Sequence, residues 1–453
     1  MTKLNSLILA LTLLFLAALV LFAFWPNAAA SQGSSANREE VIFWHFWGGQ
    51  DRLVVEEVIE RFNAFQARYR VRGIAMPGNN LDLKVFLAIT GGKPPDVINQ
   101  DKPILADWAE RGALLPLAEI ASPEEITELK TWLYPAARKL SECNGELYAL
   151  CNGLDIRALY YNRTLLAEHG LTPPTTLAEL DHLAEQIAPP GKERREVYGF
   201  LPDARRLWSW GPVFGGGFAV DQAGHANIDT PENQAALEWM SGYRERYGGN
   251  NLAAFRQGDQ SLPGKVFPLL TNRYAVIMDG QWRVREIRSY QRQQRAAGEP
   301  ISDFGVCPLP PPPQGVNDAG WVNGNFFVVP QGAKSPRGAW EFMKFWSGFA
   351  GHEAEAARTC AAGGWIPVSR QVVSQPEFQR YLEAEPLFAE FVRLAGSEHQ
   401  LPVPLVRGAA LFRREIERIG EVAMYHDRSP AELLAEAERN VNGHLRRQYV
   451  KRP

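Results

Sequence analysis

The sequence predicts an α/β fold with two lobes, and three observations support this prediction. A chain of 453 residues is too long for one hydrophobic core, so at least two domains are expected. Residues 40–112 alternate short apolar runs with segments of helical apolar spacing, which indicates a mostly parallel sheet covered by helices. Residues 143–174 join a tight turn to a buried strand and a short helix, as expected where the chain crosses between two halves of a molecule.

The alternation at the start of the folded part sets the first expected elements. Strands are predicted at Val41–Trp44, Val71–Ala75 and from Pro95, and helices at Asp51–Tyr69, Leu81–Thr90 and Pro103–Arg111. A further helix is expected over Glu119–Arg138, with Ser122 as its N-cap. The later helices are predicted at Leu177–Ile187, Thr230–Tyr247, Lys334–Trp346, Ala409–Met424 and Pro430–Leu445.

The crossing segment carries the clearest turn signal. Asn144-Gly145 favours a two-residue hairpin that pairs Cys143 with Glu146. Ile156–Tyr161 then reads as a buried strand with Arg157 as its one charge. The four cysteines, at 143, 151, 307 and 360, form no C-x-x-C pair and no zinc spacing, so neither a metal site nor a cofactor is expected. One or two disulfides are possible in an oxidising compartment, and a 143–151 bridge is left open.

Residues 1–30 have the pattern of an export signal. Lys3 precedes an apolar run from Leu7 to Trp25, and Ala28–Ala30 supplies a small-residue cleavage site. The run also reaches the ~17–25 residues that cross a bilayer, so cleavage and retention as an anchor both stay open. No cysteine lies near it, which argues against lipid attachment. Residues 31–39 form a polar tether, and the folded protein is expected in the periplasm or on the outer face of the cytoplasmic membrane.

Composition and motifs narrow the function classes. The net charge is −3 and no long basic stripe occurs, so nucleic acid is not an expected partner. The chain contains no G-x-S-x-G, no P-loop and no H-E-x-x-H motif. Nothing favours the paired carboxylates of a glycosidase, so the chain is interpreted as a binding protein rather than an enzyme.

Aromatic side chains beside glycines are the main candidates for a ligand site. Sugars have apolar faces with hydroxyl rims, which flat rings and planar polar groups recognise. Rings at strand ends or turns with neighbouring glycines, and polar groups past strand ends, form the candidate set; the alternative is that the rings pack one lobe against the other. The set is Trp47, Gly48, Gln100, Trp208, Gly216, Trp282, Trp321, Asn323 and Trp365, with Asp101, Trp210 and Asn325 close by.

Several segments together resemble one known family. NGELYAL followed by ALYYNRTLLAEHGLTPPTTLAEL is similar to the extracellular solute-binding protein family 1, the sugar-binding components of ABC importers. GGKPPDVIN, NRYAVIMDGQW and GGWIPVS resemble further elements of that family, and the likeness covers residues 40–445. The chain departs from the family pattern at Cys151, usually Pro, and at Leu177, often Trp.

The resemblance implies a two-lobed periplasmic-binding-protein type II architecture. Lobe 1 would comprise residues 40–151 plus 328–372 and lobe 2 residues 152–320 plus 400–453, with hinge crossings near 152–162, 320–328 and 372–400. A small-molecule ligand, expected to be a carbohydrate, would bind between the lobes, and hinge closure would present it to an ABC permease in the membrane. The binding protein would be a monomer without cofactors.

The same resemblance adds Asp155 to the candidate set. It falls where the family has a ligand-contacting acid, although an ion pair with Arg157 is an equally open role. Two alternatives to sugar import remain. The first is binding of a polyol phosphate or another non-sugar, since Arg205, Arg206, Arg273 and Arg283 leave room for an anion. The second is a membrane-anchored ligand sensor.

Overall fold

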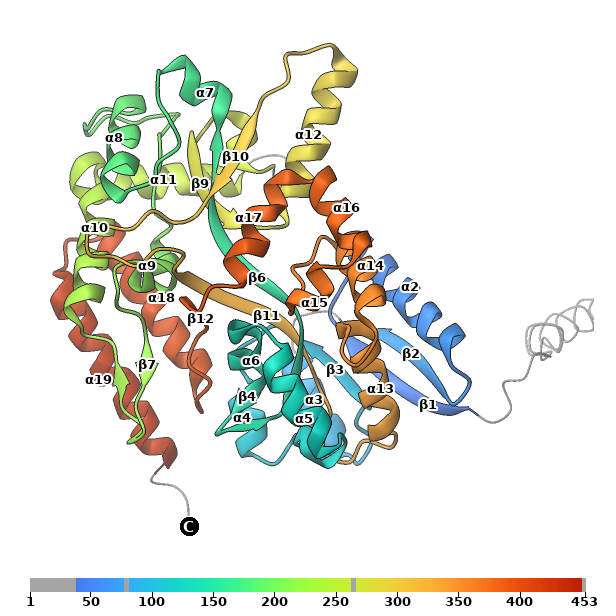
Figure 1. The fold of residues 1–453 in the computed structure, drawn as a ribbon. Helices are drawn as coiled ribbons and strands as arrows, with labels where there is room; N and C mark the ends of the chain where they lie inside the picture. The colour runs from blue at the N-terminus through green and yellow to red at the C-terminus, as the bar shows by residue number, and fades with distance from the viewer. Residues whose placement is uncertain (1–37, 77–80, 262–265, 450–453) are drawn as a thin grey trace, which may run out of the picture.

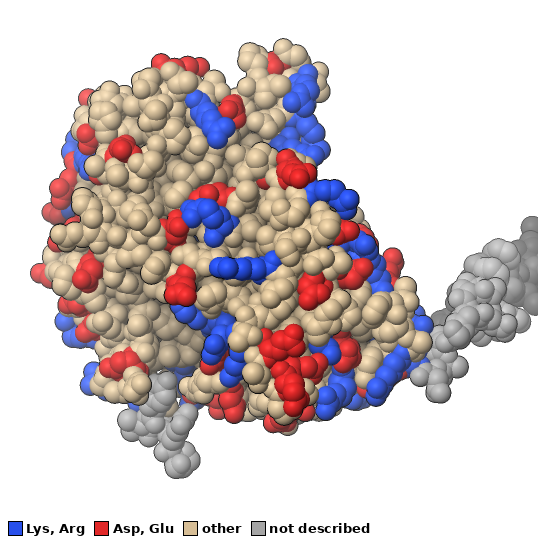
Figure 2. Space-filling view, viewed as in Figure 1, with Lys and Arg blue, Asp and Glu red and all other residues tan. Residues whose placement is uncertain are grey.

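The computed structural model describes residues 38–76, 81–261 and 266–449. The apolar run Leu7–Trp25 and most of the polar tether lie outside these residues. Within the described ranges, none of the helices combines the length and apolar character needed to span a bilayer. On the face shown in Figure 2, acidic and basic side chains are intermixed rather than separated into areas of one sign.

One mixed eight-stranded sheet organises the fold. Its order is β10-β6-β11-β3-β1-β2, with β9 also paired to β6 and β12 to β11. The strands are β1 (Glu39–His45), β2 (Tyr69–Ala75), β3 (Val97–Gln100), β6 (Ala149–Asn162), β9 (Val276–Gly280), β10 (Phe304–Cys307), β11 (Gly320–Val328) and β12 (Gln400–Leu401). A short hairpin, β7 (Ala219–Val220) and β8 (Ala226–Asn227), lies apart from this sheet.

β6 is the strand that connects the two ends of the sheet. Its first half, Ala149–Ile156, pairs with β11, and its second half, Arg157–Asn162, pairs with β9 and β10. Figure 1 shows β6 running from the group that contains β1–β3 to the group that contains β9, β10 and α12 (Arg283–Ala297). The predicted strand at Ile156–Tyr161 is therefore present but much longer than the apolar run suggested.

The expectation of a mostly parallel sheet in each lobe is correct for the N-terminal strands, and elsewhere in the sheet only the short β11–β12 pair is parallel among the described residues. β1 pairs in parallel with β2 and β3. β6, however, is antiparallel to β9, β10 and β11, and β11 is antiparallel to β3. The route of the chain explains why β9 is antiparallel to β6. β9 begins opposite Tyr161, near the C-terminal end of β6, and so runs back alongside β6. Apolar runs reveal strands but do not reveal their direction.

Helices cover the N-terminal strands from both ends of the sequence. They are α2 (Gly49–Phe65), α3 (Leu81–Thr90), α4 (Leu105–Glu110), α5 (Pro123–Trp132) and α6 (Pro135–Ser141). From later in the chain, α13 (Pro336–Ser347) packs on β1 and α2, and α14 (Glu353–Gly363) also packs on α2. α15 (Arg370–Val373), α16 (Pro376–Ala384) and α17 (Pro386–Ala395) follow, and α17 contacts β6 and β10.

The middle of the chain and the C-terminal helices form a second packed group. α18 (Ala409–Tyr425) and α19 (Pro430–Tyr449) pack on α10 (Pro231–Tyr247), and α18 also contacts α9 (Leu207–Val213) and α11 (Gly249–Gln260). Figure 1 shows these C-terminal helices beside the central part of the chain. α7 (Arg163–Glu168) and α8 (Leu177–Ile187) complete this group.

Two local predictions have different outcomes. The Asn144-Gly145 hairpin is confirmed: β4 (Glu142–Cys143) pairs with β5 (Glu146–Leu147), and both turn residues have positive φ. The single helix over Glu119–Arg138 is wrong, because Pro135 ends it. Proline disfavours helical backbone in the residue before it, and Tyr134 is instead extended and donates its N–H to Val368 O at 2.8 Å. All four cysteines are free thiols.

Candidate functional site

A cavity of about 570 Å³ lies over β6 and β11, between the two ends of the sheet. Its floor is formed by Leu154, Asp155 and Asn323–Asn325 of these two strands. The first wall comes from the β1–α2 turn, the residue after β3 and the end of α14: Phe46, Trp47, Asp51, Asp101 and Gly363–Trp365. The second wall comes from the β9–α12 turn: Gln281, Trp282, Arg285 and Glu286.

The first wall is built on stacked indole rings. Trp47 stacks on Trp346 with ring centroids 5.4 Å apart and on Trp365 at 5.3 Å, while Trp346 and Trp365 are nearly parallel at 5.9 Å. Trp47 and Trp365 are both buried, because their faces are largely taken by these mutual contacts. Little of either ring face is therefore left free for stacking on a ligand.

The second wall carries one open ring. Trp282 is 39% exposed, and every other tryptophan among the described residues is buried or half-buried. Gln281 fixes the turn before it: its Nε2 donates to Leu154 O at 3.1 Å and its Oε1 accepts from Ile156 N at 3.4 Å. These two bonds extend the β6–β9 pairing by one residue, so Trp282 is held at the edge of the floor.

The floor supplies polar groups directly below the rings. Asp155 and Asn323 are opposite each other in the β6–β11 register, so their side chains share a face of the sheet. Asn323 Nδ2 donates to the backbone oxygen of Asp101 at 2.8 Å, and Asp155 forms an ion pair with Arg157. The ion pair between Asp155 and Arg157, which was one of the two roles considered for Asp155 from the sequence, is thus present. The Asp155 carboxylate nevertheless lines the cavity.

The polar groups of the cavity that can still bind a ligand are mainly hydrogen-bond acceptors. Two carboxylates, on Asp101 and Asp155, line the cavity, and Arg157 engages only one oxygen of Asp155. Burial raises the pKa of the Asp101 carboxyl, while Lys102 and the backbone act in the opposite direction. Groups of this kind accept hydrogen bonds from hydroxyls.

One contact joins the two walls across the mouth of the cavity. Arg285 of α12 makes an ion pair with Asp51 of α2, with Nη1 and Oδ1 3.2 Å apart. The same guanidinium also donates to the backbone oxygen of Gly363 at the end of α14. The structure thus has the two walls in contact, with the cavity enclosed between them.

Five of the ten predicted site residues line this cavity together: Trp47, Asp155, Trp282, Asn323 and Trp365. Two others are neighbours of lining residues. Gly48 is the N-cap of α2, with open space around its Cα. Gln100 is buried at the end of β3, and its Oε1 accepts from the Asp101 amide.

The remaining three predicted residues lie in packed surroundings. Trp208 is buried against Phe218 and Phe412, with ring centroids at 4.6 and 5.4 Å. Gly216 lies where a Cβ would overlap the side chain of Asn233. Trp321 is buried, and the guanidinium groups of Arg157 and Arg206 both contact its ring, with their carbons 5.2 and 5.7 Å from the ring centroid.

Four polar or charged lining residues were not singled out from the sequence: Asp51, Gln281, Arg285 and Glu286. Gln281 had a usable signal, because it lies between Gly280 and Trp282 in the segment NRYAVIMDGQW, residues 272–282, which was already marked in the sequence. The other three are charged residues at the starts of α2 and α12, and such residues usually cover solvated helix faces. Only the three-dimensional arrangement brings them to one mouth.

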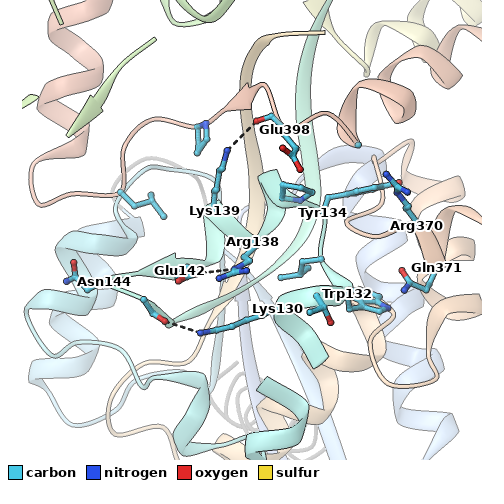
Figure 3. Close-up of a pocket in the computed structure, with 17 residues that line it drawn as sticks. Lys130, Trp132, Tyr134, Arg138, Lys139, Glu142, Asn144, Arg370, Gln371 and Glu398 are labelled. Carbon is cyan, nitrogen blue, oxygen red and sulfur yellow. Dashed lines mark hydrogen bonds and ion pairs between the residues drawn. The ribbon is translucent and has the colours of Figure 1, made fainter. Parts of the chain in front are cut away.

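A larger cavity, of about 1020 Å³, lies elsewhere (Figure 3). It is lined by α5, α6, α15 and the segment around β12, and none of the predicted site residues contributes to it. Several of its charged side chains are already engaged: Lys130 donates to Gly145 O, Lys139 to Glu398 O, and Arg138 pairs with Glu142. α6 packs on the face of β11 opposite Asn323, since a Cβ on Gly324 would meet Leu140. The larger volume of this cavity therefore does not make it the candidate site. The predicted aromatic and polar residues meet in the smaller cavity over β6 and β11.

The described residues hold no group of three or more His, Cys, Asp and Glu side chains that is arranged to bind a metal ion. The walls, the floor and the contact across the mouth instead define a cleft between two parts of the chain. This is the architecture of a solute-binding protein.

The chain belongs to the bacterial extracellular solute-binding protein family, whose model matches residues 51–350. This assignment confirms the resemblance found in the sequence, and with it the interpretation as a binding protein rather than an enzyme.

Individual relatives and structures are more distant. The chain is 24% identical over 355 residues to a maltotriose-binding protein of Pyrococcus abyssi, covering 77% of this chain and 71% of that protein. It is 27% identical over 176 residues to an sn-glycerol-3-phosphate-binding periplasmic protein of Rhizobium meliloti, covering 38% and 39%. The structure of the sugar-binding protein MalE from Xanthomonas citri superposes with a TM-score of 0.73 at 20% identity, covering 91% of this chain and 98% of that one. The structural match supports the fold.

Proposed function

We propose that this protein is the extracytoplasmic solute-binding component of an ABC importer and that it binds a sugar or oligosaccharide in the cleft over β6 and β11. The observation that carries the proposal is the exposed face of Trp282 beside the Asp155 and Asp101 carboxylates. An open ring face can stack on the apolar face of a sugar, and the carboxylates accept hydrogen bonds from its hydroxyls.

Hinge closure is the mechanism that we propose for capture. The packing of α13 and α14 on the β1–β3 group, and of α18 and α19 on α10, supports two lobes with the ranges expected from the sequence. β6 and β11 then act as crossings that bend, and the third crossing lies near residues 372–400. Closure brings Arg285 to Asp51, excludes water from the ligand and creates the shape that a membrane permease recognises. The protein acts as a monomer in this proposal.

The location follows from the family. Solute-binding proteins of this family act outside the cytoplasm. The N-terminal segment of residues 1–30 serves either as a cleaved export signal or as an anchor on the outer face of the cytoplasmic membrane. In the second case a sensor role without transport remains the alternative, and a neighbouring kinase gene in place of permease genes would favour it.

The charges of the cleft favour a neutral ligand over a polyol phosphate. Among the described residues that line it, Asp51, Asp101, Asp155 and Glu286 carry carboxylates and Arg285 carries a guanidinium. Arg285 is already paired with Asp51, and Arg157 and Arg283, which lie behind the lining, are paired with Asp155 and Glu286, so none of these three described cations is left to receive a phosphate. A phosphate dianion would instead face like charges at short range. The similarity to the sn-glycerol-3-phosphate-binding protein covers only 38% of this chain.

A thermal-shift screen tests the proposal. The purified chain is heated with maltotriose, mannobiose, other mono- and oligosaccharides and sn-glycerol 3-phosphate. A ligand that binds only the folded state adds about 2.7 kcal/mol at a hundredfold excess over Kd, so a binder raises the Tm measurably. We expect a shift with one class of saccharide and its loss in Trp282→Ala. The control is Phe65→Ala, which removes a ring that is 63% exposed and lies outside the cleft. A shift with the phosphate ester alone would overturn the ligand class.

A further inference from the structure

Behind the exposed ring of Trp282 lies a stack of alternating aromatic and cationic groups. The guanidinium carbon of Arg157 is 4.5 Å from the ring centroid of Trp282 and 5.2 Å from that of Trp321. The guanidinium carbon of Arg206 is also 5.7 Å from the ring centroid of Trp321. Arg157 is only 6% exposed, so its contacts with both rings are shielded from water. Cation–π attraction is strongest under such conditions.

The strand register creates the space for this stack. Arg157 on β6 is directly opposite Gly280 on β9. A Cβ on Gly280 would overlap Arg157 Nη1 and two ring carbons of Trp282. Glycine at this position therefore lets the guanidinium and the indole meet over the strand. Tyr160 holds the same glycine from the other side, donating its hydroxyl to Gly280 O at 2.9 Å.

Arg157 also holds the carboxylate of the floor. It pairs with Asp155, two residues earlier on the same face of β6. One buried guanidinium thus contacts both a ring and an acid that line the cleft, while Arg157 itself does not line it. The inner face of Trp282 is occupied by Arg157, so only the outer face remains for a ligand.

We propose that Arg157 is the positioning residue of the cleft: it fixes the plane of Trp282 and the orientation of Asp155, and so sets where a sugar ring stacks. This inference rests on the proposed function for its ligand, but not for the geometry that it asserts. A planar guanidinium is required, because a lysine ammonium keeps the charge but cannot lie flat between two rings.

The first arm of the test needs no ligand. The protein is labelled with 5-fluorotryptophan, and the Trp282 resonance is assigned in the ¹⁹F spectrum by its absence in Trp282→Phe. We expect this resonance to shift or broaden in Arg157→Met and, to a smaller extent, in Arg157→Lys. The matched control is Arg163→Met, which removes a guanidinium 5.6 Å from the Tyr161 ring, away from the cleft. An unchanged Trp282 resonance in Arg157→Met overturns the inference.

The second arm measures binding by calorimetry with maltotriose, or with the saccharide that gives the largest shift in the screen. Arg157→Met should weaken binding at least tenfold, Arg157→Lys should weaken it less, and Arg163→Met should leave it within twofold of the wild type. In a double-mutant cycle, Arg157→Met should cost less in the Trp282→Ala background than alone, since the ring it positions is gone. A purely structural role would lower the Tm of Arg157→Met without changing the affinity, and that result would contradict the inference.

The two arms separate the possible failures. If the wild type binds no saccharide, the proposed function fails, and the fluorine spectra still decide whether Arg157 fixes Trp282. If the wild type binds but Arg157→Met binds equally well, the positioning role fails and the proposed function stands. Should Arg157→Met not fold, Gly280→Ala attacks the same stack from the opposite strand and is expected to give the same spectral change and loss of affinity.

Discussion

His45 makes the stability of the fold depend on pH in a way that can be measured directly. It is the last residue of β1 and is 2% exposed, with its ring 5.3 Å from that of Phe43 and 6.0 Å from that of Trp47. Burial, assisted by the charge of Arg52 and opposed by Glu56, lowers the pKa of His45 from 6.5 to about 4. The folded protein therefore keeps this imidazole neutral where the unfolded chain protonates it.

The sign and size of the effect follow from linkage. Above pH 6.5 the imidazole is neutral in both states and contributes nothing to the pH dependence. As the pH falls from 6.5 towards about 4, only the unfolded state takes up the proton, so stability is lost. The loss is about 2 kcal/mol at pH 5 and levels off at about 3 kcal/mol below pH 4, since each pKa unit corresponds to about 1.4 kcal/mol.

Urea unfolding at pH 7.5 and pH 5.0 measures this loss. His45→Gln removes the titrating group. From pH 7.5 to pH 5.0, the free energy of unfolding of the wild type should therefore fall by about 2 kcal/mol more than that of His45→Gln. The control is the exposed His182→Gln, which should follow the wild type. Equal losses in wild type and His45→Gln would refute the assignment of a depressed pKa to this buried ring.

Three further predictions concern the cleft, the core and the thiols. Arg285→Ala removes the contacts with Asp51 and Gly363, so the ligand-free protein should open, which appears as a larger radius of gyration in X-ray scattering; an unchanged curve would contradict this. Asp181→Ala should lower the free energy of unfolding by roughly 2–4 kcal/mol, because it leaves Trp239, Tyr243 and Arg246 without their shared acceptor, whereas a loss below 0.5 kcal/mol would argue against the network. Burial raises the pKa of the Cys151 and Cys360 thiols to about 12, so they should react with a disulfide reagent only after unfolding, and rapid reaction of the native protein would exclude this.

Local signals in the sequence predicted local structure well. The hairpin at Asn144-Gly145 is in the expected register, because a two-residue turn allows only one pairing. The alternation over β1 to α4, the Ser122 cap of α5 and the helices α8 and α10 also match, since caps and periodicity act within one element. Pro135 carried an equally local signal, a helix stop, and the structure obeys it.

Properties set by distant parts of the chain were not accessible in the same way. The direction of β9 and β10 depends on where the chain re-enters the sheet, and no run of residues encodes that. The aromatic candidates divide for a similar reason. In the sequence, Trp282 and Trp208 both lie near glycines, yet the Trp282 ring faces the cleft, whereas Trp208 lies on α9 and is enclosed by Phe218 and Phe412. Neighbours that surround a ring come from elsewhere in the sequence.

Arg157 illustrates both what the sequence could predict and what it could not. In the sequence it is a single charge in an apolar strand and a possible partner for Asp155, and the ion pair is present. Its contacts with Trp282 and Trp321 depend on the register of β6 with β9 and on the position of Trp321 at the start of β11, and the sequence alone could not supply either.

The central claim is that the cleft over β6 and β11 binds a neutral saccharide against Trp282. Isothermal titration calorimetry of the purified chain with the saccharides of the screen and with sn-glycerol 3-phosphate tests it most directly. We predict one-to-one binding of at least one oligosaccharide, weakened at least tenfold in Trp282→Ala and unchanged in Phe65→Ala. Binding of the phosphate ester alone, or a saccharide affinity that Trp282→Ala leaves intact, would contradict it.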